Sequence, residues 1–263
     1  MEVGKGELTQ VMLEIGIDSA EVLGYIPENY LKHSTLKEYE IPHNVTSIGS
    51  DAFSGCRSLT SIEIPNSVTS IGKGAFENCT ALKSVEIPNS VTSIGKDAFA
   101  YCKSLKSIVI PNSVTSIDKF TFYDCSGLTS VVIGNSVTSI GVEAFCYCKS
   151  LTSIEISNSV IDIDSNAFYG CKNLRNIKIP DSVKSIGEYA FEDCTSLASV
   201  IIGSAVTSID DGAFHYCKSL KEIIYLGTKK EAMKLGIGNK SRKRWRAESA
   251  ISKIICTDGE IIL

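Results

Sequence analysis

The nonapeptide IPNSVTSIG occupies residues 64–72, recurs unchanged at 87–95, and returns at 110–118 with aspartate as its last residue. Each copy starts 23 residues after the one before it. Self-similarity with a fixed period of about 20 to 50 residues is typical of solenoids and propellers, in which every repeat packs on its neighbours. The nonapeptide therefore decides the fold, provided that its period extends beyond three copies.

Three columns of identical residues carry the same period through most of the chain. They are Phe53, Phe76, Phe99, Phe122, Phe145, Phe168, Phe191 and Phe214; Cys56, Cys79, Cys102, Cys125, Cys148, Cys171, Cys194 and Cys217; and Leu59, Leu82, Leu105, Leu128, Leu151, Leu174, Leu197 and Leu220. Eight periods in three columns exclude a chance match. With 43% hydrophobic and 21% charged residues, the chain has the balance of a globular protein that buries a core.

One part of each repeat has the pattern of a β-strand. The stretch SLTSIEIP (58–65) alternates apolar Ile62 and Ile64 with polar Ser61 and Glu63, which is typical of a strand with one buried face. The proline that ends the stretch has no N–H to extend a sheet ladder, and an Asn-Ser pair after it favours a turn. In other repeats this corner carries glycine or serine instead of proline, namely Gly134, Ser157 and Gly203.

The rest of the repeat predicts a second short strand and then a short helical turn. The β-branched stretch VTSI (68–71) forms the strand, and the helical turn carries the Ala-Phe pair. Between them lies the position of Gly72, which is glycine in five repeats and aspartate in three, Asp118, Asp164 and Asp210. Both residue types tolerate a positive φ angle, and aspartate also caps helix N-termini, so we expect the helical turn to begin here.

A single repeat buries too little apolar surface to fold alone, so the repeats must stack with strands about 4.8 Å apart. The sequence therefore predicts a β-rich α/β solenoid, with a parallel β-sheet on one face, short helical turns on the other side, and a cap at each end. We assign residues 1–35 to an N-terminal capping helix and lead-in, 36–226 to the solenoid, and 227–263 to a C-terminal cap.

Both caps have recognisable patterns. At the N-terminus an amphipathic helix is indicated by i, i+3, i+4, i+7 spacing of Leu8, Val11, Met12 and Ile15, and the degenerate repeat LKEYEIP (36–42) follows. In the C-terminal segment, YLGTKKEAMKLGIGN predicts a strand, a helix and a glycine turn. Asp258-Gly259 then separates two apolar runs, which predicts a hairpin.

The consensus I-P-x-S-V-T-S-I-G-x-x-A-F-x-x-C-x-x-L-x-S-I resembles the BspA-like leucine-rich repeat family of bacteria, over about residues 36–226. The resemblance is carried by the columns of Ile48, Ala52, Phe53, Cys56 and Leu59. It implies a curved leucine-rich repeat superhelix. It also implies surface binding or adhesion to a protein ligand, such as a host or matrix protein, and it supplies no catalytic residues.

The ten cysteines invite a metal or disulfide interpretation, which the period argues against. A column repeated in every rung places its sulfur atoms in a line, whereas a tetrahedral site needs four ligands around one ion. Parallel side chains on neighbouring rungs also keep their Cβ atoms farther apart than a disulfide allows. We expect buried, reduced thiols. Cys146 lies outside the column, where it is either a chance substitution or an exposed reactive thiol.

Nothing in the sequence indicates catalysis. The three histidines, His33, His43 and His215, have no evident nucleophile or carboxylate partner, and no catalytic, phosphate-binding or metal-binding motif is present. We therefore expect no enzymatic activity, no cofactor and no metal.

A basic segment near the C-terminus is a candidate site for polyanions. Residues 229–263 contain nine Lys or Arg against four acidic residues. Clustered cations beside an aromatic residue, here Trp245, are the usual footprint of nucleic-acid or polyanion binding. The cluster comprises Lys240, Arg242, Lys243, Arg244 and Arg246. A solvated charged segment of the cap is the competing interpretation, and we regard nucleic acid as an improbable partner.

The outward side of the predicted main sheet is the candidate protein-binding face. Strand alternation exposes a uniform column of mostly serine residues and a second column of changing character. The second column contains Glu63, Glu86, Val109, Val132, Glu155, Lys178, Ile201 and Ile224. Two exposed valines beside charged neighbours suit a protein contact, although valine and isoleucine also suit any strand.

Three functions follow as hypotheses. The first is a non-enzymatic scaffold that binds a protein on its sheet face, the second a structural spacer or self-associating solenoid, and the third a polyanion-binding protein. The N-terminus lacks the features of a signal peptide, and no stretch reaches the about 18 apolar residues of a membrane helix. We expect no membrane insertion, whereas the family resemblance implies a surface or secreted protein.

Overall fold

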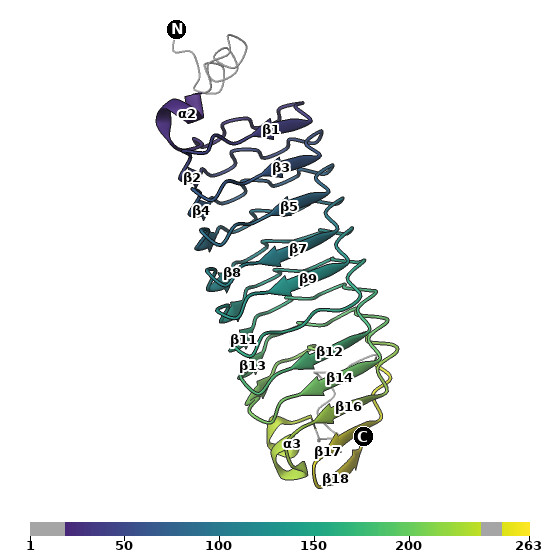
Figure 1. Ribbon diagram of the computed structural model, residues 1–263. Helices are drawn as coiled ribbons and strands as arrows, with labels where there is room; N and C mark the ends of the chain where they lie inside the picture. Colours follow the sequence, from purple (N-terminus) through teal and green to yellow (C-terminus); the bar gives the residue numbers. More distant parts are fainter. Residues whose placement is uncertain (1–18, 238–248) are drawn as a thin grey trace.

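The computed structural model describes residues 19–237 and 249–263 and shows a long stack of about eight similar rungs (Figure 1). Each rung has three sides: a main strand, a short strand and a chain of turns. Equivalent residues of neighbouring rungs are 23 positions apart and lie directly above one another. The core fills the inside of the stack, as the repeat predicts.

The main strands pair in parallel along one side, where Ile62 and its equivalents point inward and Glu63 and its equivalents point outward. They form three sheets in the orders β1-β3-β5, β7-β9 and β12-β14-β16. The strands are β1 (Glu38–Glu40), β3 (Ser61–Glu63), β5 (Ser84–Glu86), β7 (Ser107–Ile110), β9 (Ser130–Ile133), β12 (Asn176–Ile179), β14 (Ser199–Ile202) and β16 (Glu222–Tyr225).

The expected second strand is present in every full rung as a two-residue strand. These strands also pair in parallel, in the orders β2-β4-β6 and β8-β10-β11-β13-β15. They are β2 (Ser47–Ile48), β4 (Ser70–Ile71), β6 (Ser93–Ile94), β8 (Ser116–Ile117), β10 (Ser139–Ile140), β11 (Asp162–Ile163), β13 (Ser185–Ile186) and β15 (Ser208–Ile209).

The third side corrects one expectation, because it consists of turns and not of short helices. The backbone N–H of Phe53 donates to Ala75 of the next rung at 2.7 Å, and Gly55 donates to Glu77 at 2.7 Å, while the residues between them bond within their own rung. This alternation gives backbone N–H and C=O groups hydrogen-bond partners in the neighbouring rungs, whereas a helix would pair them within one rung.

The positive φ angles on this side also lie elsewhere than predicted. They occur two and six positions after the Gly72 column, for example at Asp97 (58°) and Tyr101 (61°). Gly72 itself has no positive φ; a Cβ atom there would lie 2.6 Å from the backbone carbon of Gly49 in the preceding rung. Close approach of two rungs therefore explains the glycines of this column, and the three rungs with aspartate tolerate a side chain there.

The phenylalanine column forms the centre of the core. All eight rings are at most 1% exposed. Adjacent rings from Phe53 to Phe214 stack with centroids 5.2 to 5.6 Å apart and interplanar angles of 1° to 10°. Because the stack is continuous, each ring contributes to the interface on both sides of its rung.

The cysteine column lies beside this stack and has a hydrogen-bonding role. From the second rung of the column onward, the thiol donates to the carbonyl of the phenylalanine in the preceding rung, as Cys79 does to Phe53 at 3.1 Å and Cys102 does to Phe76 at 3.2 Å. In the first rung Cys56 donates to the carbonyl of Leu31 at 3.0 Å instead. All ten cysteines are free and buried, and burial is the expected outcome for the eight residues of the column. A small apolar side chain with a weak S–H donor suits this position.

The ends of the stack extend the rung pattern. Helix α2 (Ser19–Leu23) precedes residues 24–34, which already bond to the first full rung, for example from Leu31 N–H to Ala52 O at 2.7 Å. The degenerate repeat forms β1, which pairs with β3. The predicted amphipathic helix around Leu8, Val11, Met12 and Ile15 lies outside the described residues.

The C-terminal cap has the predicted strand, helix and hairpin. Helix α3 (Lys229–Leu235) begins with a capping box between Thr228 and Glu231 and ends at Gly236 with φ 82°. Strand β17 (Lys253–Cys256) pairs in parallel with β16, and β18 (Gly259–Ile262) pairs antiparallel with β17. The hairpin turn consists of Thr257 and Asp258, one position before the predicted pair, because Gly259 already pairs with Cys256 in the sheet. Lys229 N–H donates to the Asp258 carboxylate at 2.7 Å.

Candidate protein-binding face

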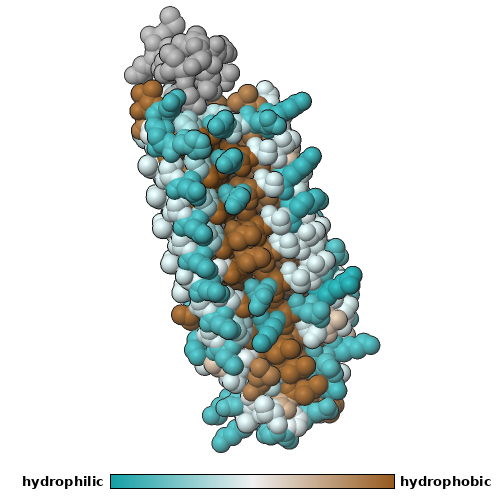
Figure 2. Space-filling view, viewed as in Figure 1, coloured by the Kyte–Doolittle hydropathy of each residue, from teal (hydrophilic) through white to brown (hydrophobic). Residues whose placement is uncertain are grey.

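The main sheet presents the predicted outward column to solvent. Glu63, Glu86, Glu155 and Lys178 are exposed, and Val109 and Val132 are each 57% exposed. Ile201 and Ile224 are half-buried, so they offer less surface than predicted. Figure 2 shows an apolar band along the long axis of this face, interrupted by hydrophilic side chains.

The main sheet is interrupted in the middle of this face. Residues 153–156 form no strand, although their sequence keeps the repeat pattern, and they make a single isolated bridge from Ser153 to Asn176. Thr152 N–H bonds to Thr129 O at 3.5 Å, longer than the 2.9 Å bond from Thr129 to Lys106 one rung earlier. The rungs therefore separate slightly between β9 and β12.

Two contiguous open grooves run along the face. The larger has a volume of about 1230 Å³, and Val109, Val132, Glu155 and Lys178 lie in its lining. The smaller has a volume of about 740 Å³, is lined by Glu63 and Glu86, and shares Val109 with the larger one. Together they join most of the predicted face residues into one surface.

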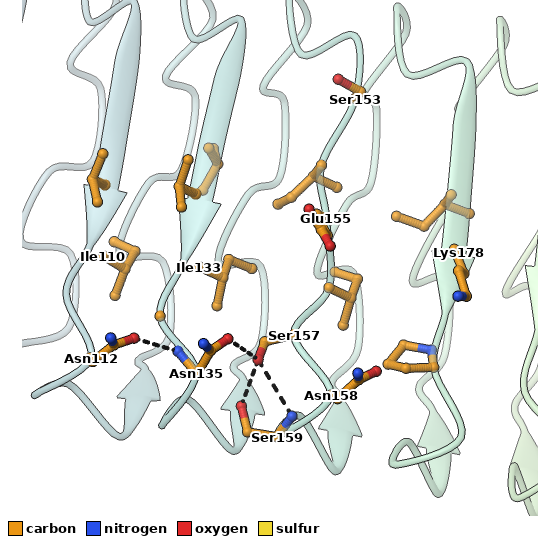
Figure 3. A pocket seen from close by; sticks show the side chains of 18 of the residues that line it. Ile110, Asn112, Ile133, Asn135, Ser153, Glu155, Ser157, Asn158, Ser159 and Lys178 are labelled. Atoms are coloured by element: carbon orange, nitrogen blue, oxygen red, sulfur yellow. Dashed lines mark hydrogen bonds between the residues drawn. The ribbon is translucent and has the colours of Figure 1, made fainter.

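A row of asparagines lines the corner side of both grooves. It comprises Asn66, Asn89, Asn112, Asn135 and Asn158. Figure 3 shows how two of them are held: Asn135 N–H donates to Asn112 Oδ1 at 2.7 Å, and the Ser157 hydroxyl donates to Asn135 Oδ1 at 3.2 Å. We call these five residues the asparagine row.

The charges of the face have no ion-pair partner in the part of the chain that the structure describes. Within residues 19–237 and 249–263, Glu63, Glu86, Glu155 and Lys178 take part in no ion pair. On the turn side, by contrast, Lys103 pairs with Asp124 at 3.2 Å and Lys172 with Asp193 at 3.2 Å. The face thus combines an acidic end, an apolar centre and one exposed cation.

The cysteines have a structural role, and the basic cluster near the C-terminus lies outside the described residues. Cys146 is 2% exposed, so its interpretation as an exposed thiol is wrong. Burial raises the pKa of the thiols, to about 11 for Cys56 and about 12 for Cys217. Lys240, Arg242, Lys243, Arg244, Arg246 and Trp245 lie outside the described residues.

The histidines do not form a site. His43 lies in the lining of the smaller groove, and His215 packs against Tyr189 with ring centroids 5.9 Å apart. In the part of the chain that the structure describes, no group of three His, Cys, Asp or Glu residues has the arrangement of a metal site. Among the same residues, no helix is both long and apolar enough to span a membrane.

The sequence reasoning missed a row of aromatic residues on the turn side. Tyr101, Tyr123, Tyr147 and Tyr169 come from four successive rungs and contact edge to face, with centroids 5.2 to 5.8 Å apart. Gly170 leaves room for this packing, because a Cβ atom there would lie 2.7 Å from the Tyr147 ring. The signal was present as tyrosine in the one or two positions after each phenylalanine of these rungs.

Comparisons with known proteins agree with this architecture. The family described as "BspA type Leucine rich repeat region (6 copies)" matches residues 24–152 and 138–234. No match was found among curated proteins.

Solved structures of bacterial leucine-rich repeat proteins are similar to this chain. A leucine-rich cell surface protein from Faecalibacterium prausnitzii A2-165 is 32% identical, with a TM-score of 0.54 over 80% of this chain and 65% of that one. A leucine-rich repeat protein from Bacteroides ovatus is 30% identical, with a TM-score of 0.50 over 72% and 63%. This chain thus spans just under two thirds of both.

A third structure supports the fold alone. The leucine-rich repeat protein of T. pallidum is 24% identical, with a TM-score of 0.54 over 85% of this chain and 90% of that one.

Proposed function

Because this chain belongs to the BspA-type leucine-rich repeat family, we propose that it is a non-enzymatic scaffold that binds a protein ligand on its main sheet face. The observation that carries the proposal is the pair Val109 and Val132, each 57% exposed in a groove whose neighbouring charges have no ion-pair partner among the described residues. An apolar centre with a charged border is the usual composition of a protein interface.

The rigidity of the solenoid supports this function. Main-chain bonds tie successive rungs together on all three sides. The face residues therefore keep their relative positions before a ligand arrives. Binding to such a surface costs little conformational entropy on the side of the scaffold, so moderate contacts spread over several rungs are sufficient.

We further propose that the ligand is met outside the cell. The F. prausnitzii relative is described as a cell surface protein, and family resemblance suggests a host or matrix protein as ligand. Protease treatment of intact cells tests this location, because an exposed solenoid releases fragments before lysis. Protection until lysis would contradict it and direct the search to ligands inside the cell.

The binding proposal is tested with a double variant, Val109→Ser with Val132→Ser, against a panel of immobilised extracellular proteins. We expect the variant to lose binding that the unmodified chain shows, with unchanged thermal unfolding. Ile161→Ser is the matched control, since Ile161 is also exposed (44%) but lies beside the short strands. Equal binding by the double variant would remove the sheet face as the site.

A further inference from the structure

We propose that the ligand of the sheet face is an extended peptide in the polyproline II conformation, rich in proline and carrying basic and apolar residues, which lies along the asparagine row. The inference rests on the proposed function, because it names the class of ligand for the same face. Three independent features lead to it: the hydrogen-bonding groups of the row, the spacing of the rungs, and the charges of the groove.

The hydrogen bonds between rungs fix which groups the asparagine row offers. The atom of Asn112 that meets the backbone N–H of Asn135 must be the amide oxygen, because an N–H cannot donate to an NH₂ group. The NH₂ group of Asn112 then remains free of protein acceptors within the described residues. The side-chain amide of Asn135 meets the Ser157 hydroxyl at 3.2 Å, and a hydroxyl can pair with either the oxygen or the NH₂ group of an amide. At Asn112 the row therefore presents an NH₂ donor, because the amide oxygen of this residue is used in a bond between rungs.

A proline-rich peptide complements such a row. Proline has no N–H, so the peptide carries backbone carbonyl acceptors and few backbone donors. In polyproline II these carbonyls make no internal hydrogen bonds and point to solvent. The conformation is also formed before binding, which lowers the entropy cost of association.

The spacing of the rungs matches the same conformation. Two rungs span about 9.6 Å along the stack, at about 4.8 Å each. Three residues of polyproline II rise about 9.3 Å and complete one turn. Every third peptide residue therefore faces the groove again two rungs further on. A β-strand does not repeat in this way, because its residues i and i+3 point to opposite faces.

The charges and the apolar centre define the residues at those third positions. A basic residue meets Glu63 and Glu86 in the smaller groove, and an apolar residue two rungs on meets Val109 and Val132. The next third position reaches Glu155, whose carboxylate again favours a basic residue, with the cation of Lys178 one rung further along the groove. The predicted recognition pattern is thus basic-x-x-apolar-x-x-basic, with proline at the positions between.

Fluorescence anisotropy with the full chain tests the proposal. The probe is a fluorescein-labelled peptide, Lys-Pro-Pro-Val-Pro-Pro-Lys-Pro-Pro, and the comparison peptide replaces every Pro-Pro pair with Gly-Ser. We expect saturable binding of the proline peptide and clearly weaker binding of the flexible one. Equal binding of the two peptides, or no binding of the proline peptide, would overturn the inference.

A protein variant tests the donor row itself. Asn112→Asp with Asn135→Asp keeps an oxygen for each bond between rungs and removes the NH₂ donors. The chain shows that aspartate fits this column, because Asp181 accepts from Ser204 N–H at 2.6 Å. We expect peptide affinity to fall about tenfold or more, the effect of losing two hydrogen bonds. Ser136→Asp, which adds a charge at an exposed neighbouring position, is the control and should bind as the unmodified chain does.

The outcomes separate this inference from the proposed function. If a folded protein binds the face and Val109→Ser with Val132→Ser abolishes that binding, while the proline peptide does not bind, the peptide inference fails and the proposed function stands. If the peptide binds equally to the Asn→Asp variant and the unmodified chain, the donor row is not used and the inference fails. If neither peptide nor protein binds, both fail.

Discussion

At the scale of single residues, each column of the repeat makes a contact that recurs along the stack. The carbonyl of Phe76 accepts from Cys79 N–H in its own rung at 3.2 Å and from the Cys102 thiol in the next at 3.2 Å. Cysteine therefore serves two needs at once, since it fills a small apolar space and donates a weak hydrogen bond. Neither alanine nor valine would satisfy that second lone pair.

Loss of one central ring should destabilise the solenoid strongly. Phe122 is fully buried between the rings of Phe99 and Phe145. We expect Phe122→Ala to lower the free energy of unfolding by about 3 to 5 kcal/mol, the range for a buried phenylalanine, as measured by urea denaturation. Val132→Ser, at an exposed position of the neighbouring rung, is the control. A small effect of Phe122→Ala would show that the stack relaxes around the cavity.

The cysteine column should make stability depend on alkaline pH. Burial raises the pKa of the folded thiols, to about 11 for Cys56, so they stay protonated where the unfolded chain already ionises. The stability is complete below the unfolded pKa of about 8.5 and falls as the pH rises from there toward the folded value. We expect the melting temperature to decrease between about pH 8 and about pH 10, a range that includes the unfolded pKa of about 8.5.

Labelling with a thiol reagent provides a second measurement of thiol burial. The reaction is run at about pH 8, just below the unfolded cysteine pKa of about 8.5. All ten thiols are buried, so native protein should react slowly and urea-unfolded protein rapidly. Fast labelling of Cys146 in native protein would contradict its burial, and a disulfide between Cys79 and Cys102 in native protein would contradict the argument from the column.

At the scale of elements, the break in the main sheet is a feature that the repeat pattern does not predict. Residues 153–156 have the same apolar alternation as strands β3 and β9, and yet they form no strand. In this rung the corner residue is Ser157, whose hydroxyl bonds to Asn135 and contacts Ser159 Oγ at 3.0 Å. Such contacts depend on side chains of two rungs, so the pattern of one rung does not reveal them.

Hydrogen exchange should detect this break. We expect the amides of 154–156 to exchange faster than those of β9 and β12, because backbone groups without ladder partners open more readily. The short strand of the same rung, β11, is paired on both sides and serves as the internal control. Equal protection of 154–156 and β9 would show that the main sheet is continuous in solution.

The C-terminal cap offers a test at its helix. Thr228 Oγ1 accepts from Glu231 N–H at 3.3 Å, and Glu231 Oε2 accepts from Thr228 N–H at 2.8 Å. Thr228→Ala should destabilise the protein by about 1 kcal/mol, the usual cost of losing an N-cap, measured by thermal unfolding. Thr228→Ser keeps the acceptor and should restore most of the stability. If both variants behave alike, the capping box contributes nothing.

At the scale of the whole molecule, the sequence predicted the stack, both kinds of strand, the C-terminal cap and the exposed valines, because all of these follow from the period. It did not predict which residues take positive φ. Asp97, Phe120 and Glu143 share such a position although their side chains have nothing in common. The bonds between rungs impose this backbone, as from Phe120 N–H to Val142 O at 3.0 Å, and leave the side chain free to vary.

The binding face was also predictable only in part. Exposure follows from strand alternation and was predictable, whereas the groove depends on how far two rungs separate. The asparagine row was visible in the sequence as part of a turn. The Asn112 NH₂ group is identified as a donor for a ligand only by the bond that the amide oxygen of Asn112 accepts from Asn135 N–H.

The period of the stack leads to a last prediction, that one whole rung can be removed. Deletion of residues 90–112 removes 23 residues and joins Asn89 to Ser113, so the Asn-Ser corner is kept. In a solenoid each rung contacts only its neighbours, and stability is a sum over rungs and interfaces. We expect a folded protein that is less stable and about 4.8 Å shorter, measured by circular dichroism and small-angle X-ray scattering.

The matched control for this deletion removes half a rung. Deletion of residues 90–100 takes out fewer residues, but it shifts Phe122, Cys125 and the strands that follow out of register with the rungs before them. If nearest-neighbour contacts hold the molecule together, the smaller deletion is the more damaging one and abolishes cooperative unfolding. The opposite order would mean that chain length, and not the register of the columns, determines whether this protein folds.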